Sequence, residues 1–116
     1  MEAGYYQTKS GRLPVKIFVN SIDDFKVKNK TLRAMQLLEE EGLVFSLSKG
    51  DSEPVPPYKN LYALRIRWKN TWYRIFFTKK GSIIYYLDVV KKQSNKFKKY
   101  ELRKVVNQAK DIGCIK

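Results

Sequence analysis

Two arginines, Arg65 and Arg74, are the side chains of this sequence best suited to chemistry on an anion. Each stands in a segment that alternates like a strand, 61–68 and 71–77, and only Lys69-Asn70 separates the two segments. This pattern predicts a β-hairpin with a two-residue turn, in which Arg65 lies directly opposite Arg74. Because like charges placed opposite each other destabilise a sheet, we interpret the pair as a receptor for an anion. A three-residue turn would shift the pairing by one position.

Strand alternation divides the expected hairpin into two faces. One face is apolar enough to be buried against helices and consists of Tyr62, Leu64, Ile66, Trp68, Tyr73, Ile75 and Phe77. The other face carries the charges and consists of Arg65, Arg67, Trp72, Arg74 and Phe76. With a two-residue turn at Lys80-Gly81, Tyr85 and Lys91 join this charged face, unless a β-bulge intervenes.

The charged face has the composition of a binding site for single-stranded RNA or DNA. Arginine forks match the oxygens of a phosphate, and aromatic rings stack on unpaired bases. The alternative is a structural role, in which the arginines extend toward solvent or form ion pairs with Glu39, Glu40 and Glu41.

The charge of the chain also favours a polyanionic partner. The net charge is +13 at pH 7, and residues 65–110 contain fourteen lysines and arginines against two acids, Asp88 and Glu101. Such a one-sided charge favours nucleic acid, an anionic membrane surface or an acidic protein, and the interleaved aromatic residues favour nucleic acid among these. Lysines that only keep the protein soluble are the alternative.

The residue types exclude several other chemistries. The sequence has no histidine, which removes the usual general base and the commonest transition-metal ligand. Cys114 is the only cysteine, so neither a disulfide framework nor a thiolate metal site is expected, and no metal or other cofactor is proposed. No apolar run is long enough to span a membrane and the N-terminus lacks a signal-peptide core, so we expect a cytoplasmic protein with no membrane partner.

The elements that position these residues are expected to form one domain, 1–116. After a short strand near 5–9, a short helix over 13–19 begins with Pro14 in its first turn. A longer helix runs from a Ser21 cap to Glu41 and stops at Gly42. The apolar stripe of this helix, expected to pack on the sheet, is Leu32, Met35 and Leu38.

The second half of the chain is expected to contain the sheet. An irregular loop over 43–60 leads into three strands at 61–68, 71–78 and 82–90, and a helix over 98–112 follows. The order of strand, two helices, three antiparallel strands and helix predicts a small α+β domain with a mainly antiparallel sheet.

Three short segments, taken together, resemble the RelE/HigB toxin superfamily and specifically its phage-derived HigB-like group. They are Leu61-Tyr62-Ala63-Leu64-Arg65, Tyr73-Arg74-Ile75-Phe76-Phe77 and Val89-Val90-Lys91-Lys92. The group typically shows a Glu-Leu-Arg strand, a Tyr-Arg-Val-Leu strand and a Phe-Val-Lys-Lys strand end in that order. Ala63 departs from the pattern because glutamate is common there, and Leu87-Asp88-Val89 stands in place of His-Gly-Phe. The resemblance covers about residues 5–110.

The resemblance implies a RelE-like fold and a bacterial toxin of a type II toxin–antitoxin pair. Such a toxin is a metal-independent endoribonuclease that cleaves mRNA on the ribosome, and its partner is a cognate antitoxin, here expected to be a small helix-turn-helix protein. By position, Arg65 and Arg74 match the phosphate-handling arginines of the family, and Lys91 and Lys92 match its lysine pair. Further contacts with RNA are expected from Arg67, Trp72, Tyr85, Lys96 and Tyr100.

Cleavage without histidine requires another base for the 2′-hydroxyl. A lysine among other cations is available, since neighbouring positive charge lowers its pKa, and either Lys91 or Lys92 fits this role. Tyr85 or Tyr100 could donate a proton or stack on a base. Two other functions stay open: a non-catalytic nucleic-acid-binding protein of phage origin with the same fold, and an interaction module for an acidic protein.

Overall fold

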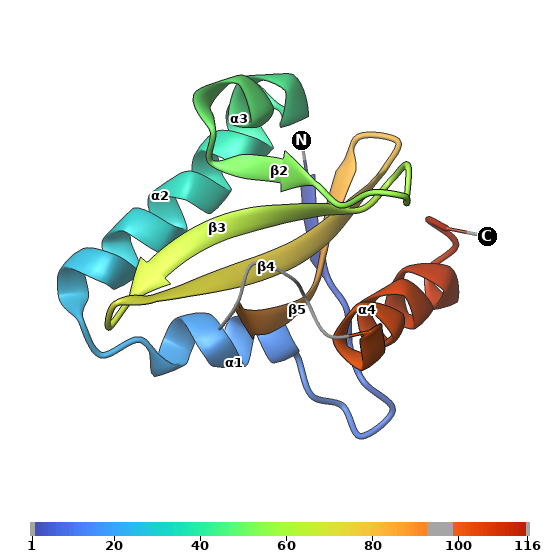
Figure 1. The fold of residues 1–116 in the computed structure, drawn as a ribbon, viewed down its shortest axis with the longest axis horizontal. Coiled ribbons are helices and arrows are strands. Elements are labelled where there is room, and N and C mark those ends of the chain that lie inside the picture. The colour runs from blue at the N-terminus through green and yellow to red at the C-terminus, as the bar shows by residue number, and fades with distance from the viewer. Residues whose placement is uncertain (1, 93–98, 116) are drawn as a thin grey trace.

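A five-stranded mixed sheet in the order β1-β5-β4-β3-β2 forms the centre of the protein. The computed structural model describes residues 2–92 and 99–115, with side chains at 2–91 and 101–115. The strands are β1 (Glu2–Tyr5), β2 (Ser52–Pro54), β3 (Tyr62–Trp68), β4 (Thr71–Lys80) and β5 (Ile83–Lys92). Only β1 pairs in parallel, with β5, and the other three pairings are antiparallel. The α+β class expected from the sequence is confirmed (Figure 1).

The hairpin of β3 and β4 has the predicted two-residue turn. Lys69 and Asn70 both adopt positive φ, 53° and 58°, which is the backbone of a type I′ turn and matches the twist of antiparallel strands. The register therefore places Arg65 opposite Arg74, as predicted. The next turn is formed by Gly81 and Ser82 rather than by Lys80 and Gly81.

A β-bulge interrupts the pairing of β4 with β5. Phe77 pairs with Tyr86 and Phe76 pairs with Asp88, so Leu87 is an extra residue on β5. Because side chains alternate between the faces of a sheet, one extra residue exchanges the faces of all later residues on β5.

Within the described residues, four helices cover the two faces of the sheet. They are α1 (Pro14–Ser21), α2 (Phe25–Glu41), α3 (Leu43–Lys49) and α4 (Lys99–Asp111). Side chains of α1 and α2 pack with Leu64, Ile75 and Phe77 on one face, which confirms the expected apolar face of the hairpin. The other face packs Phe76 and Leu87 against α4, which lies on the side of the sheet opposite α2 (Figure 1).

Two details of the helical half differ from expectation. The cap of α2 is Asp24, whose carboxylate accepts the N–H groups of Lys26 and Val27, while Ser21 ends α1. Gly42, with φ of 93°, ends α2 as predicted. In the apolar stripe, however, Leu32 is 45% exposed and the buried position is taken by Thr31.

The expected irregular loop over 43–60 is partly regular. It contains α3 and the short strand β2, which extends the sheet beyond β3. The prediction was wrong because Pro54, Pro56 and Pro57 suggest irregular backbone, whereas Pro54 is tolerated at the end of an edge strand. This addition matters for the site, because β2 brings Glu53 to the charged face.

Candidate nucleic-acid interface

The two opposed arginines have very different surroundings. Arg65 is exposed, whereas Arg74 is buried, with 5% of its surface accessible. The buried guanidinium needs a compensating negative group, because an isolated charge in a protein interior is strongly disfavoured. The pair is thus one surface cation beside one structural cation.

Glu53 supplies the negative group. Its Oε1 accepts a hydrogen bond from Arg74 Nε at 2.7 Å, and the two side chains form an ion pair. Glu53 lies opposite Ala63 in the pairing of β2 with β3, so Arg74 on β4 reaches Glu53 past a small residue on the intervening strand. The alternative partners Glu39, Glu40 and Glu41 are therefore wrong for Arg74, although a structural ion pair does exist.

Arg74 also keeps one unsatisfied donor. Its Nη1 is buried and has no hydrogen-bond partner among the described residues. A buried donor without a partner has a cost of about 1–3 kcal/mol, so an anion oxygen that reached it would be bound favourably. Nη1 is itself covered by protein, so a ligand would reach it only if neighbouring side chains moved.

Trp72 gathers the arginines into a cluster. The guanidinium carbons of Arg65, Arg67 and Arg74 lie 5.4, 5.8 and 5.6 Å from the centre of its ring. Each such cation–π contact contributes about 0.5–1 kcal/mol at an exposed site. Trp72 is itself 40% exposed, so the ring holds the cations in place and still offers surface to a ligand. We call Arg65, Arg67, Trp72 and Arg74 the arginine–tryptophan cluster.

Two aromatic residues expected beside this cluster do not reach it. Phe76 is fully buried in the core beneath α4 and offers no ring to a ligand. Tyr85 is on the expected face but lies opposite Thr78, four residues along β4 from Arg74. At the rise of a strand this is about 13 Å, which separates Tyr85 from the cluster.

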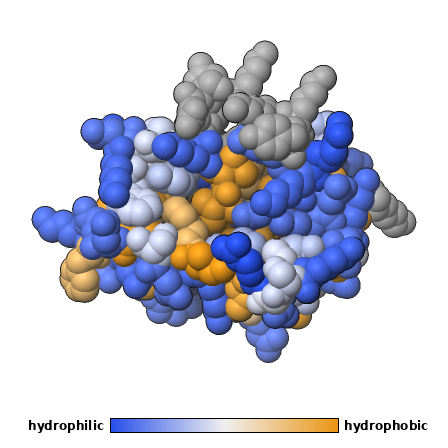
Figure 2. All heavy atoms as spheres, turned by 90° about the horizontal axis from the view of Figure 1, so that it is seen from below, coloured by the Kyte–Doolittle hydropathy of each residue, from blue (hydrophilic) through white to orange (hydrophobic). Residues whose placement is uncertain are grey.

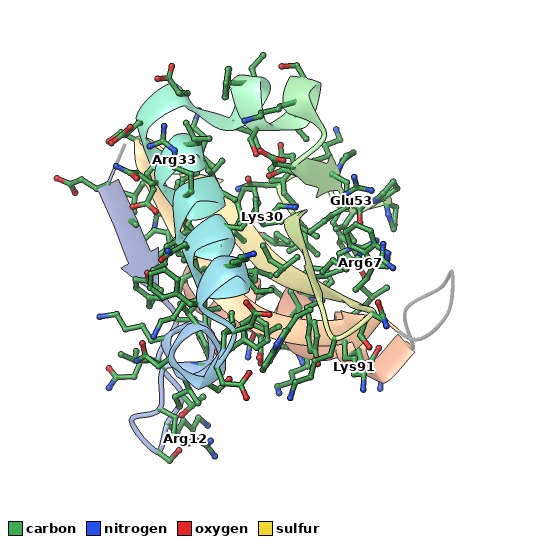
Figure 3. All side chains as sticks on the ribbon, turned by 90° about the vertical axis from the view of Figure 1, so that its left-hand side faces the viewer. Arg12, Lys30, Arg33, Glu53, Arg67 and Lys91 are labelled. Atoms are coloured by element: carbon green, nitrogen blue, oxygen red, sulfur yellow. The ribbon has the colours of Figure 1, made fainter. Side chains whose placement is uncertain are left out.

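The expectation that Lys91 shares the charged face is wrong. The bulge at Leu87 exchanges the faces of β5, and Lys91 pairs with Tyr73 on the face that packs on α1. Figure 3 accordingly shows Lys91 away from Glu53, with Arg67 between them. Lys92 pairs with Trp72 instead, so the backbone of Lys92 lies beside the arginine–tryptophan cluster.

Lys91 lines a different feature, an open cavity of about 540 Å³ beside α1. Apolar residues, among them Ile17, Phe18 and Val89, form part of its lining, and Arg12 and Lys104 lie around it. Figure 2 views the molecule from the side on which α1 lies and shows apolar atoms at the centre of this face with hydrophilic atoms around them.

The two remaining candidates come from the segment after β5. Lys96 lies outside the described residues. Tyr100 belongs to the first turn of α4, and its side chain lies outside the described side chains.

The part of the chain that the structure describes contains no group of three or more histidine, cysteine, aspartate or glutamate side chains placed to hold a metal ion. Within the same residues, no helix has both the length and the apolar character needed to cross a membrane.

The sequence analysis missed Glu53, which determines the conformation of Arg74. A signal did exist, since Ala63 stands where the resembled group has a glutamate. A carboxylate lost from one strand can be replaced from the next, but the pairing of β2 with β3 was needed to identify Glu53 as its source.

Comparison with known proteins assigns the chain to a family. No curated protein matches the sequence. The family model of the phage-derived Gp49-like proteins (DUF891) matches residues 20–110, which include α2, the arginine–tryptophan cluster, β5 and most of α4. The chain therefore belongs to the phage-derived Gp49-like protein family, a family of the RelE/HigB-like toxin superfamily.

Proposed function

We propose that this protein is the toxin of a type II toxin–antitoxin system and that it cleaves mRNA on the ribosome as an endoribonuclease. The observation that carries the proposal is the arginine–tryptophan cluster, a partly exposed indole surrounded by three guanidinium groups in a member of a toxin-type family. Exposed Arg65 and Arg67 would hold a phosphate, and Trp72 would stack on an adjacent base.

Arg74 has a separate part in this proposal. Since Glu53 fixes Arg74 Nε, the remaining guanidinium nitrogens, Nη1 among them, would be left for a phosphate oxygen. A donor held in place before the substrate arrives stabilises developing charge on the phosphorane without reorganisation in the reaction. Glu53 is then a positioning residue for Arg74.

The proton transfers are assigned to the end of β5. Lys92 pairs with Trp72 in the sheet, so we propose Lys92 rather than Lys91 as the base that takes the proton of the 2′-hydroxyl. The oxygen O2′ would then attack phosphorus, and O5′ would leave with a proton from Tyr100 or from water. No metal ion enters this scheme.

The partners follow from the same proposal. The substrate would be mRNA in the ribosomal A site, which places the activity in the cytoplasm, and ribosome contacts would supply part of the acceleration by positioning the strand. The antitoxin would be a small helix-turn-helix protein encoded beside this chain.

Binding without cleavage is the second candidate function. It is favoured by the position of Lys91, since one of the two lysines matched to the family pattern faces α1 and not the cluster. A protein of this kind would keep the basic face and bind RNA without cutting it.

Induced expression in a bacterial host separates the two functions. We expect the wild type to arrest growth and to produce new 5′ ends within ribosome-bound mRNA. Arg65→Ala with Arg67→Ala should abolish both effects and leave a folded domain, because both side chains are exposed. The matched control is Lys9→Ala with Lys26→Ala, which removes two exposed cations away from the cluster and should still arrest growth.

Each outcome decides between the candidates. Harmless expression with intact mRNA would overturn the toxin proposal. RNA binding without new 5′ ends would favour the second candidate. Arrest that persists in the Arg65 and Arg67 double variant would show that the cluster is not the active site.

A further inference from the structure

A basic groove lies between α2 and the edge of β3, next to the arginine–tryptophan cluster. It has a volume of about 510 Å³, within the range of about 300–1,000 Å³ typical of small-ligand sites. Lys30 and Arg33 of α2 and Lys49 at the end of α3 line one side, while Arg65, Arg67 and Trp72 line the other. We call this cavity the α2–β3 groove. Figure 3 shows Lys30 and Arg33 on α2, and Arg67 on the side of the neighbouring strands.

The groove exists because β2 is shorter than β3. Their pairing covers only Tyr62 to Leu64, and the N–H of Arg65 donates to the carbonyl of Asp51 at 2.9 Å. Beyond this point no strand among the described residues pairs with that edge of β3. The edge over Ile66–Trp68 is thus open, and the groove reaches from one face of the sheet around it to the other.

The chemistry of the groove suits a nucleotide. Its five cations are all exposed, and Asp51 is the one carboxylate in its lining. Between the cations lie apolar side chains, among them Val27, Leu37 and Ile66, which can contact the face of a base. Cations that hold phosphates beside an apolar surface that accepts bases are the combination used to bind single strands.

Three residues belong to both sites. Arg65, Arg67 and Trp72 line the groove and also form most of the arginine–tryptophan cluster. We propose that an RNA strand bound at the cluster crosses the open edge of β3 and continues into the α2–β3 groove, which holds the nucleotides beside the one at the cluster. This inference rests on the proposed action on RNA and adds the path of the strand.

An acidic segment of a protein partner is the other occupant that the charge would accept. RNA fits better, because the groove is continuous with Trp72, whose exposed ring can stack on a base at the point where the strand would cross. If RNA follows this path, loss of the groove cations should weaken the binding of long strands more than that of short strands. Occupation of the groove by a protein segment predicts no such difference.

The test removes the cations that belong to the groove alone. Lys30→Ala, Arg33→Ala and Lys49→Ala are combined in one variant, and Lys9→Ala, Lys26→Ala and Lys59→Ala form a control with the same change of charge at exposed positions outside the groove. Binding of labelled oligouridylates of about 4 and about 12 nucleotides, which span site sizes seen on single strands, is measured by fluorescence anisotropy at several salt concentrations. Circular dichroism checks that both variants are folded.

We expect the groove variant to bind the short strand as the wild type does and to bind the long strand more weakly. For the long strand, the slope of log affinity against log salt concentration should become shallower by about 2, from three lost phosphate contacts at ~0.7 each. The control should match the wild type on both strands.

The outcomes separate this inference from the proposed function. If the wild type binds no RNA, the proposed function and the strand path both fail. If the wild type binds RNA and the groove variant equals the control on the long strand, the path alone is overturned. Unchanged RNA binding together with loss of an acidic antitoxin would assign the groove to the protein partner instead.

Discussion

Among single residues, Arg74 and Glu53 make the clearest link between folding and chemistry. The ion pair compensates the buried positive charge of Arg74. It holds one guanidinium nitrogen in place, while another has no hydrogen-bond partner. Arg65, two residues beyond Ala63 on β3, stays exposed and free to meet a ligand. One arginine therefore belongs both to the fold and to the candidate site, and the other belongs to the candidate site alone.

Substitution of Glu53 tests this division. Glu53→Ala should lower the free energy of unfolding by about 1–3 kcal/mol, because the buried guanidinium loses its partner. Glu53→Gln should cost less, since the amide oxygen can still accept from Arg74 Nε. Urea denaturation followed by tryptophan fluorescence measures both. An alanine variant as stable as the wild type would contradict the assigned role of the pair.

The same two variants test the role of Glu53 in activity. As a positioning residue, Glu53 should tolerate Gln with most of the mRNA cleavage retained and tolerate Ala poorly. If Glu53→Gln instead binds RNA normally but no longer cleaves it, the carboxylate takes a proton in the reaction and is more than a positioning residue.

Among the secondary-structure elements, the β3–β4 hairpin sets the geometry of the cluster. Its turn places Lys69 and Asn70 in the left-handed region, where a residue such as lysine carries a strain of about 1–2 kcal/mol. Glycine and asparagine adopt this conformation more readily than lysine does. The hairpin is thus formed with a turn that is not the most stable one available.

Replacing the turn by Asn-Gly should therefore stabilise the protein. Lys69→Asn with Asn70→Gly is expected to raise the free energy of unfolding by about 0.5–1 kcal/mol, since strain in the native turn exceeds the added freedom of the unfolded chain. Thermal unfolding measures the change. A drop in the melting temperature would mean that the Lys69 side chain, which lies 4.9 Å from the ring centre of Trp68, contributes more than the strain costs.

Tyr86 connects two other elements, β5 and α2. Its hydroxyl donates to Glu39 Oε2 at 2.8 Å, and its ring is fully buried. Burial, and then the hydrogen bond to Glu39 and the negative charge of that residue, raise the pKa of Tyr86 above its ordinary value of 10.0. A raised pKa in the folded state means that the unfolded chain loses this proton first as pH rises.

This shift predicts alkaline destabilisation. The contribution of Tyr86 should be fully present below pH 10 and should decrease as pH rises above 10. Tyr86→Phe removes the titrating group, so its stability should fall less steeply between about pH 9 and pH 11 than that of the wild type. Denaturation series at each pH measure the two slopes. Parallel slopes would assign the alkaline loss to other groups, of which Tyr5 also has a raised pKa.

For the molecule as a whole, the net charge of +13 is the dominant property. Like charges crowded on a small domain repel each other and favour the unfolded chain, while the same charge attracts a polyanion. The fold places part of this charge around the open edge of β3, where the cluster and the α2–β3 groove meet. Binding of a polyanion there would relieve the repulsion in the free protein.

Salt should stabilise the free protein for this reason. Raising sodium chloride from about 20 mM to about 200 mM screens the repulsion between charges more than about 10 Å apart. The melting temperature should therefore increase, by about 4 °C for each 1 kcal/mol of relieved repulsion. Differential scanning fluorimetry measures the shift. The variant with Lys9→Ala, Lys26→Ala and Lys59→Ala has a smaller net charge and should respond less. No shift in either protein would mean that its cations are too well dispersed to repel.

The sequence by itself determined the features that depend on neighbours along the chain. Alternation and a two-residue turn set the register of Arg65 and Arg74, because pairing in a tight hairpin follows from the turn. The end of α2 at Gly42 was predictable as well, because such a helix end requires only the positive φ of the glycine itself. The short motifs around the two arginines were likewise sufficient to indicate the toxin superfamily, to which the Gp49-like match assigns the chain.

Tertiary structure decided everything that depends on distant segments. The bulge at Leu87 moved Lys91 to the other face of the sheet, and packing beneath α4 buried Phe76. The strand β2 brought Glu53 to Arg74 and, by ending early, left the edge of β3 open. These outcomes depend on which strands pair and how far the pairing extends. Both are set by pairing and packing with other elements of the fold, which no local pattern records.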